Sequence, residues 1–187
     1  MESDLKNRAA KLKTHFSKSF WLPEEKFFAL ALDSTAEPCS VISSNPGHLL
    51  DTGIITDDQA KAVVARLMEP DMFSGWGIRT LSSKEKRYDP KSYHNGSIWP
   101  HDNAIIVRGM LKRGYLDEGK RVINSLFEVA LASPDKRLPE LFCGYPRANE
   151  PSPTPYAVSC VPQAWCVGSV FEMMDALNDS KAKIKLR

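Results

Sequence analysis

The residue best placed for chemistry in this sequence is Glu140, in the segment LPELF. Apolar residues on both sides predict that its carboxylate is partly dehydrated, and either Arg137 or Arg147 can keep it ionised. An ionised carboxylate in a defined orientation is what a general base requires. The structural alternative is a loop carboxylate that simply pairs with one of the two arginines.

A carbohydrate site would explain the side chains that surround this carboxylate in the sequence. Sugars present flat CH faces and rings of hydroxyl groups, so they are bound by aromatic platforms and by planar polar groups that make directional hydrogen bonds. The segments FSGWGIRTL, YHNGSIWPHDN, LPELFCGYPR and PQAW supply this mixture. The candidate substrate-binding residues are Trp76, Arg79, Tyr93, His94, Asn95, Trp99, Asp102 and Gln163. Glycosidic hydrolysis also needs two carboxyl groups, and Glu140 is suited to one of these roles.

Several of these residues have structural alternatives. Asp102 and His101 fall near the start of an expected helix, where acidic residues are common because they interact favourably with the helix dipole. Tyr93 and Trp99 are of types that are often buried in a core, although the polar residues between them favour a sugar platform. Arg79 is also suited to pinning its loop.

Composition limits the classes of function. The 187 residues are 42% hydrophobic, which fits one globular domain, here residues 1–187. The 25 basic and 23 acidic residues give a net charge of +2, so no broad field gathers nucleic acid or an anionic membrane, and a neutral substrate fits better. No segment reaches the roughly 18 apolar residues of a membrane span, and we expect a cytoplasmic protein.

The cysteines indicate neither a metal site nor a disulfide framework. Cys39, Cys143, Cys160 and Cys166 show no CxxC spacing and no paired histidines. We therefore expect reduced, mostly buried thiols, with no metal and no other cofactor. The basic tail KAKIKLR is expected to be a solvated chain end rather than a nucleic-acid patch.

Apolar periodicity and capping signals predict five helices. They cover residues 3–18, 57–68, 100–114 and 117–132, with a fifth that opens near Pro162. The fifth is apolar nearly all round, so Trp165 and the Met and Phe residues at 170–174 are expected to pack in the core. The one strand-like run is FFALALD, residues 27–33.

Long connections rich in Pro, Gly, Ser and aromatic residues cover 35–55, 70–98 and 133–158, and their aromatic content favours functional loops over disorder. Exposed amphipathic helices alternate with nearly all-apolar ones. This pattern predicts an all-α chain with two concentric layers of helical hairpins, as in an α/α toroid.

Six ordered blocks carry a resemblance to a known family. The succession SNPGHLL, RLM, FSGWGIRTLS, YHNGSIWPHDNAII, LPELF and PQAW resembles the catalytic domain of amylo-α-1,6-glucosidase proteins, which are glycogen-debranching-like α/α-barrel glycosidases, and the match runs from about residue 20 to 177. The resemblance implies an (α/α)6 barrel and an inverting mechanism with Glu140 as base. It also implies that residues 93–103 and Trp76 line the sugar subsite. The bond cleaved would be a terminal α-glucosidic one, with a mannosyl or glucosylglycerate bond as the alternative.

The resemblance covers the closing half of such a barrel. In the family the general acid is an aspartate in the first half, so we expect that this acid lies outside the chain; spacing alone does not select a substitute among Asp51, Asp89 and Asp102. Apolar helix faces that would meet the missing hairpins are expected to be covered by a second copy or by a partner chain. The alternative function is a non-catalytic half-barrel that binds oligosaccharide or completes a partner subunit.

Overall fold

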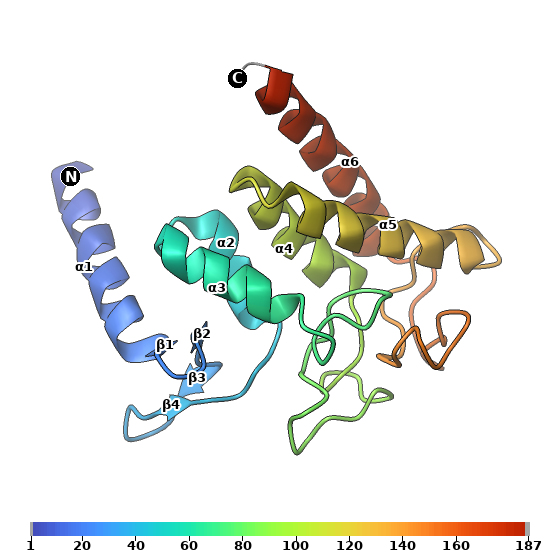
Figure 1. Cartoon of the computed structure of the whole chain (residues 1–187), viewed down its shortest axis with the longest axis horizontal. Helices are drawn as coiled ribbons and strands as arrows, with labels where there is room; N and C mark the ends of the chain where they lie inside the picture. Colours follow the sequence, from blue (N-terminus) through green and yellow to red (C-terminus); the bar gives the residue numbers. More distant parts are fainter. Residues whose placement is uncertain (1, 186–187) are drawn as a thin grey trace.

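The computed structural model describes the backbone of residues 2–185 and the side chains of residues 2–179, so the tail expected to be solvated, KAKIKLR, lies outside the described side chains. Within this part the chain is rich in helix, and its few strands are short (Figure 1). The helices are α1 Glu2–Phe20, α2 Leu49–Thr52, α3 Asp57–Leu67, α4 Pro100–Lys112, α5 Leu116–Ala132 and α6 Ala164–Lys185, with a 3-10 helix η1 at Asn45–His48. This confirms the helical class, while closure into a toroid remains a prediction.

The segment 27–33 does not form one strand, contrary to the prediction. It is divided between β2 Phe27–Phe28, which pairs antiparallel with β1 Trp21–Leu22, and β3 Ala31–Leu32, which pairs with β4 Pro38–Cys39. Phe27 and Phe28 are both fully buried, whereas Leu30 is 43% exposed. The segment therefore belongs to two small hairpins. Only the first of them delivers large side chains to the core.

The start of α3 follows from its sequence. Thr56 caps the helix by accepting a hydrogen bond from the Gln59 N–H, and the Gln59 side chain accepts one from the Thr56 N–H in return. This capping box satisfies two backbone donors that the first turn would otherwise leave without partners. Ala60, Val63 and Val64 then face the core, as their spacing predicts.

Helix α4 is the centre of the packing. It contacts α2, α5 and α6, and Ile106, Val107 and Met110 are fully buried. A helix covered on several sides needs apolar residues around most of its circumference, which explains the run AIIV at its start. Pro100 occupies the first turn, where its missing N–H costs no hydrogen bond. The first turn of α4 therefore presents His101 and Asp102 at the end of a rigid, buried helix.

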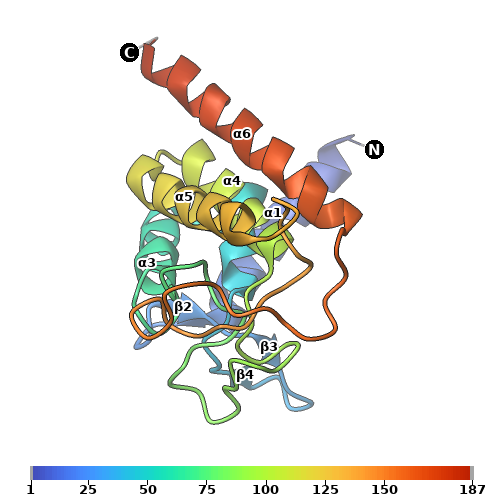
Figure 2. The ribbon, with the colours of Figure 1, turned by 90° about the vertical axis from the view of Figure 1, so that its right-hand side faces the viewer.

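Helix α6 is less buried than its sequence predicts. Cys166, Ser169 and Met173 pack on the protein, but Trp165 is 65% exposed and Phe171 is 64% exposed. The predictions that Trp165 and the Met and Phe residues of 170–174 all pack in the core are therefore wrong, Met173 excepted. The physical reason is that α6 contacts α4 and α5 along one side, and its C-terminal end extends past them (Figure 2).

The long connections 70–98 and 133–158 lie together at one end of the helices (Figures 1 and 2). Isolated antiparallel bridges tie them to each other: Ile98 pairs with both Arg79 and Phe142, and Phe142 pairs with Pro155. The connection 35–55, in contrast, contains β4, η1 and α2 rather than irregular chain alone. No helix in the described part of the chain has the length and apolar character needed to cross a membrane.

Candidate active site

The Glu140 carboxylate is fixed by hydrogen bonds to both of its oxygens. The Tyr93 hydroxyl donates to Oε1 over 2.8 Å, and the Cys160 backbone N–H donates to Oε2 over 3.0 Å. The Glu140 N–H donates in turn to the Cys160 carbonyl over 3.1 Å, so side chain and backbone are both tied to the segment around residue 160. Only 7% of the residue surface is exposed. These contacts leave the carboxylate little freedom to rotate.

The same contacts keep the carboxylate ionised. The Cys160 N–H and then the Tyr93 hydroxyl lower the pKa of Glu140, because a hydrogen bond donated to a carboxylate favours its charged form, and desolvation opposes them more weakly. In return, the bond to Glu140 raises the pKa of Tyr93 to about 12. The expectation that Arg137 or Arg147 supplies this effect is wrong: Arg147 pairs with Glu128 at 2.6 Å. Backbone and phenol donors replace the predicted arginine.

A row of aromatic rings leads away from Glu140. We call it the aromatic row, and in order it consists of Tyr156, Tyr93, Trp99, His101 and Trp165, with neighbouring ring centroids 5.8, 4.8, 5.5 and 4.4 Å apart. The Trp99 indole N–H donates to the Tyr93 carbonyl over 3.1 Å, which fixes these two members relative to each other. The loop before α4 thus contributes two rings, and the first turns of α4 and α6 and the segment 154–160 contribute one each.

Three further candidate residues lie beside this row. The His94 ring lies parallel to Trp99 at 6.1 Å. The Gln163 side chain contributes to lowering the pKa of Glu140, and its Oε1 lies 3.3 Å from the Cys166 sulfur. Asp102 belongs to the first turn of α4, next to His101. The structure therefore brings Tyr93, His94, Trp99, Asp102, Gln163 and Glu140 into one region.

Asp102 is paired with His48, a residue that sequence reasoning did not single out. His48 Nε2 lies 2.5 Å from Asp102 Oδ1. This hydrogen bond raises the pKa of His48, against the opposing effect of burial. The second oxygen, Oδ2, is shielded and has no hydrogen-bond partner, and the same is true of His101 Nδ1. Burial lowers the pKa of His101, which favours the neutral ring.

Trp76, Arg79 and Asn95 are not part of this region. The Trp76 ring is 5% exposed and is covered by the Arg147 guanidinium, 4.2 Å from its centroid. Arg79 is 2% exposed and donates to the carbonyls of residues 144, 70 and 71, as a loop pin would. The Asn95 side chain is exposed, and its backbone holds the loop through Ser92 and Asp89. A sugar-binding role for these three remains a prediction.

Four residues of the site were not predicted to have this role: His48, Tyr156, Cys160 and Trp165. Cys160 acts mainly through its backbone N–H, which any residue type except proline would supply, while its side chain adds a smaller lowering of the Glu140 pKa. This side chain is exposed, which departs from the expectation of mostly buried thiols. All four cysteines are free, and Cys143 and Cys166 are buried as expected. Sequence signals for two of the four residues were present in the blocks SNPGHLL, which contains His48, and PQAW, which contains Trp165.

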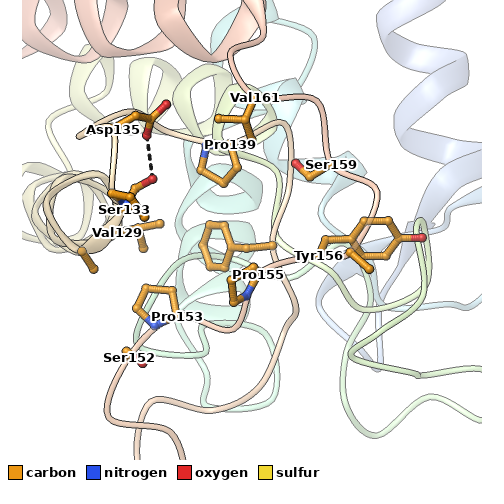
Figure 3. Close-up of a pocket in the computed structure, with 14 residues that line it drawn as sticks. Val129, Ser133, Asp135, Pro139, Ser152, Pro153, Pro155, Tyr156, Ser159 and Val161 are labelled. Atoms are coloured by element: carbon orange, nitrogen blue, oxygen red, sulfur yellow. Dashed lines mark hydrogen bonds between the residues drawn. The ribbon is translucent and has the colours of Figure 1, made fainter.

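A separate cavity of about 710 Å³ adjoins this region (Figure 3). Pro139, Phe142, Pro155, Ser159 and Val161 line it, together with Tyr156 of the aromatic row. Glu140 does not line it. The cavity is therefore distinct from the immediate surroundings of the Glu140 carboxylate.

No cluster of three or more His, Cys, Asp or Glu side chains suited to a metal ion occurs among the described residues. The chemistry that these residues offer is that of an oriented, ionised carboxylate beside aromatic platforms. This combination suits activation of a water molecule next to a sugar ring.

Solved structures with a similar fold include glycosidases. An uncharacterized conserved protein from Thermus thermophilus superposes with a TM-score of 0.68 at 16% identity, over 84% of this chain and 38% of that one. The GH63 mannosylglycerate hydrolase from the same organism, in complex with Tris, superposes with a TM-score of 0.59 at 17% identity, over 86% of this chain and 34% of that one. A glycosidase variant in complex with glucose superposes with a TM-score of 0.66 at 16% identity, over 94% of this chain and 44% of that one. The chain thus spans less than half the length of each structure.

A comparison with curated proteins gives no match. A family model does match: the mannosylglycerate hydrolase MGH1-like glycoside hydrolase domain, over residues 1–143, a range that contains Tyr93, Trp99, Asp102 and Glu140. The match covers most of the chain and supports the glycoside hydrolase class, but not the glycogen-debranching family in particular. The chain belongs to the family of MGH1-like glycoside hydrolase domains.

Proposed function

We propose that this chain forms the general-base side of an inverting, exo-acting glycoside hydrolase, with Glu140 as the base. The observation that carries the proposal is the double anchoring of Glu140 by Tyr93 and by the Cys160 N–H, at one end of the aromatic row. A base must be ionised before it can accept a proton, and the lowered pKa of Glu140 meets this condition.

In this mechanism Glu140 removes a proton from a water molecule while the water oxygen attacks the anomeric carbon. The glycosidic bond breaks, and a second carboxyl group donates a proton to the departing oxygen. Inverting enzymes hold the two carboxyl groups roughly 6.5–9.5 Å apart to leave room for the water. Tyr93 holds Glu140 in position, and the exposed ring of His94, which is supported by the buried Trp99, offers a stacking surface for the sugar.

The general acid is proposed to come from polypeptide outside this chain. Asp51 is unsuited, because hydrogen bonding to Lys112 lowers its pKa, whereas an acid that donates a proton near neutral pH needs a raised one. Asp89 is exposed and accepts the Lys91 N–H, and Asp102 is paired with His48. We therefore propose that residues 1–187 are the C-terminal portion of an α/α-barrel domain, completed by further chain, a second copy or a partner.

The proposed substrate carries a terminal α-linked hexose. The blocks described above favour a terminal glucosyl bond, as in glycogen debranching, while the matching family is named after mannosylglycerate hydrolase. A panel of α-linked glucosyl disaccharides, glucosylglycerate and mannosylglycerate therefore covers the candidates. Direct attack by water on an α-linked substrate releases the β-anomer first, which proton NMR resolves before mutarotation.

The test is Glu140→Gln, which keeps the shape of the side chain and removes its basicity. In the complete enzyme, turnover of the hydrolysed member of the panel is expected to fall roughly 10²-fold or more, as for loss of general-base catalysis. Glu128→Gln is the matched control, because Glu128 pairs with Arg147 away from the site. Full turnover by the Glu140 variant would exclude Glu140 as the base. A completed barrel that binds sugars without hydrolysing them would support the non-catalytic half-barrel instead.

A further inference from the structure

We propose that Trp165, His101 and Asp102 form a second subsite, next to the Glu140 site, that binds a neutral hexose ring of the substrate rather than an organic acid. The Trp165 indole stacks on a CH face of the sugar, and the Asp102 carboxylate accepts a hydroxyl hydrogen bond. This inference rests on the proposed function, because it places the second unit of the substrate whose first unit lies at Glu140.

The first argument for this subsite is the position of Trp165. Its side chain is 65% exposed although it begins a helix whose inner side is buried, and its ring lies 4.4 Å from that of His101. Through His101 it continues the aromatic row that reaches Tyr93, the residue bonded to Glu140. An exposed indole that extends a row of rings from a candidate general base is placed to bind the next sugar unit.

Trp165 is also separate from the other exposed apolar side chains of α6. Val167, Phe171 and Met174 are all exposed and follow one another at helical spacing, which defines the α6 stripe. With 3.6 residues per turn, Trp165 lies nearly half a turn away from the centre of this stripe. A surface that covers the α6 stripe therefore does not have to cover Trp165.

Two polar atoms, one on His101, whose ring contacts Trp165, and one on the adjacent residue Asp102, lack partners. Asp102 Oδ2 and His101 Nδ1 are shielded, and neither has a hydrogen bond within the described part of the protein. A shielded polar atom without a partner costs free energy, which a ligand hydroxyl recovers. The Asp102 side chain still keeps 13% of its surface exposed, so a small rotation of the carboxyl group brings Oδ2 to the surface. Its other oxygen stays anchored to His48.

The charges of this region favour a neutral partner. Asp102 and Glu140 are both acidic, and the cation closest to Asp102 is its own partner His48. Arg108, the next cation along α4, is already paired with Asp51 and Glu172. A carboxylate such as that of glycerate would meet the like charge of Asp102 and Glu140, whereas sugar hydroxyls donate to carboxylates without that penalty. The subsite thus selects a second hexose.

Binding by the 187-residue chain tests the proposal by calorimetry and NMR. The probes are glucose, maltose, isomaltose and trehalose as neutral ligands, and glucosylglycerate as the anionic one. We expect at least one disaccharide to bind more tightly than glucose, and Trp165→Ala to remove that advantage with a loss of about tenfold in Kd, or about 1.4 kcal/mol. Glucose binding itself should stay unchanged.

Phe171→Ala is the matched control, because Phe171 is as exposed as Trp165 and lies on the α6 stripe. It should leave every Kd unchanged. Tyr93→Ala reports on the Glu140 site and should weaken glucose as well. If Tyr93→Ala abolishes binding while Trp165→Ala changes no Kd, the second subsite is wrong and the proposed function stands. If no sugar binds, or if binding depends on neither Tyr93 nor Trp165, the second subsite and the proposed function are both wrong.

Asp102→Asn tests the charge argument separately. The variant keeps the shape of the side chain and removes the negative charge, so the ratio of glucosylglycerate affinity to disaccharide affinity should rise severalfold. An unchanged ratio, or a wild-type preference for glucosylglycerate that requires Trp165, would overturn the selection for a neutral hexose.

Discussion

The Tyr93 hydroxyl donates a 2.8 Å hydrogen bond to Oε1 of Glu140, although the two residues are 47 positions apart in the sequence. Each side chain changes the acidity of the other. The bond lowers the pKa of the carboxylate and raises that of the phenol to about 12, so this pair is ionised on one side and protonated on the other throughout the neutral range.

Replacing Tyr93 by Phe should therefore shift the acid side of the pH–rate profile. Activity requires ionised Glu140 and falls as the pH drops through its pKa. Loss of the phenol donor raises that pKa, so the acid limb should move to higher pH. The measurement is turnover against pH in the active enzyme. Tyr156→Phe is the control, because Tyr156 contacts the Tyr93 ring without bonding Glu140. An acid limb that stays in place in the Tyr93 variant would contradict this account.

Arg79 should stabilise the fold through its hydrogen bonds, so that a lysine, which keeps the positive charge, should not replace it. Its guanidinium donates to the carbonyls of residues 144, 70 and 71 at once, and a lysine ammonium cannot span them. Arg79→Lys should lower the free energy of unfolding by about 2–4 kcal/mol, because shielded carbonyls lose their donors. Denaturant unfolding measures this. Arg8→Lys, on the exposed helix α1, should change the free energy of unfolding by no more than about 0.5 kcal/mol. An equally small effect of Arg79→Lys would exclude the role of Arg79 as a loop pin.

Gly144 should tolerate no side chain. A Cβ there would lie 1.7 Å from the Gly96 carbonyl oxygen, so the loops that carry Tyr93 and Glu140 would have to separate. Gly144→Ala should cost about 3 kcal/mol or more in unfolding free energy. In contrast, a Cβ at Gly168 in α6 meets nothing within 4 Å, and Gly168→Ala should stabilise the protein by about 0.5–1 kcal/mol. Similar thermal midpoints for the two variants would refute the close approach of the loops.

The α6 stripe is expected to mediate association. Val167, Phe171 and Met174 are exposed at adjoining positions, and such faces are commonly covered by a second copy. Light scattering at micromolar concentration should show a species larger than one chain, and Phe171→Asp should return it to the monomer by placing a charge in the contact. A wild-type protein that is cleanly monomeric would count against this prediction.

Local signals in the sequence were sufficient for most helices. Thr56 and Gln59 mark the start of α3 through a capping box, and Pro100 marks the start of α4. These signals work because a helix start is decided within one turn, by neighbours in the chain. The segment 27–33 was misjudged because its apolar residues do not say which partner strand each half will find. Strand pairing depends on residues outside the segment itself.

The residue types also determined where a carboxylate and aromatic platforms occur, and the blocks that contain them indicated a glycosidase. Tertiary structure alone decided how they meet. Glu140 is held by Tyr93 and by a backbone N–H of residue 160 instead of by a nearby arginine, and Asp102 is held by His48 from 54 positions away. The same is true of α6, where contact with α4 and α5 on one side leaves Trp165 exposed. Composition reports which side chains are apolar, but which of them are covered depends on the elements that pack against them.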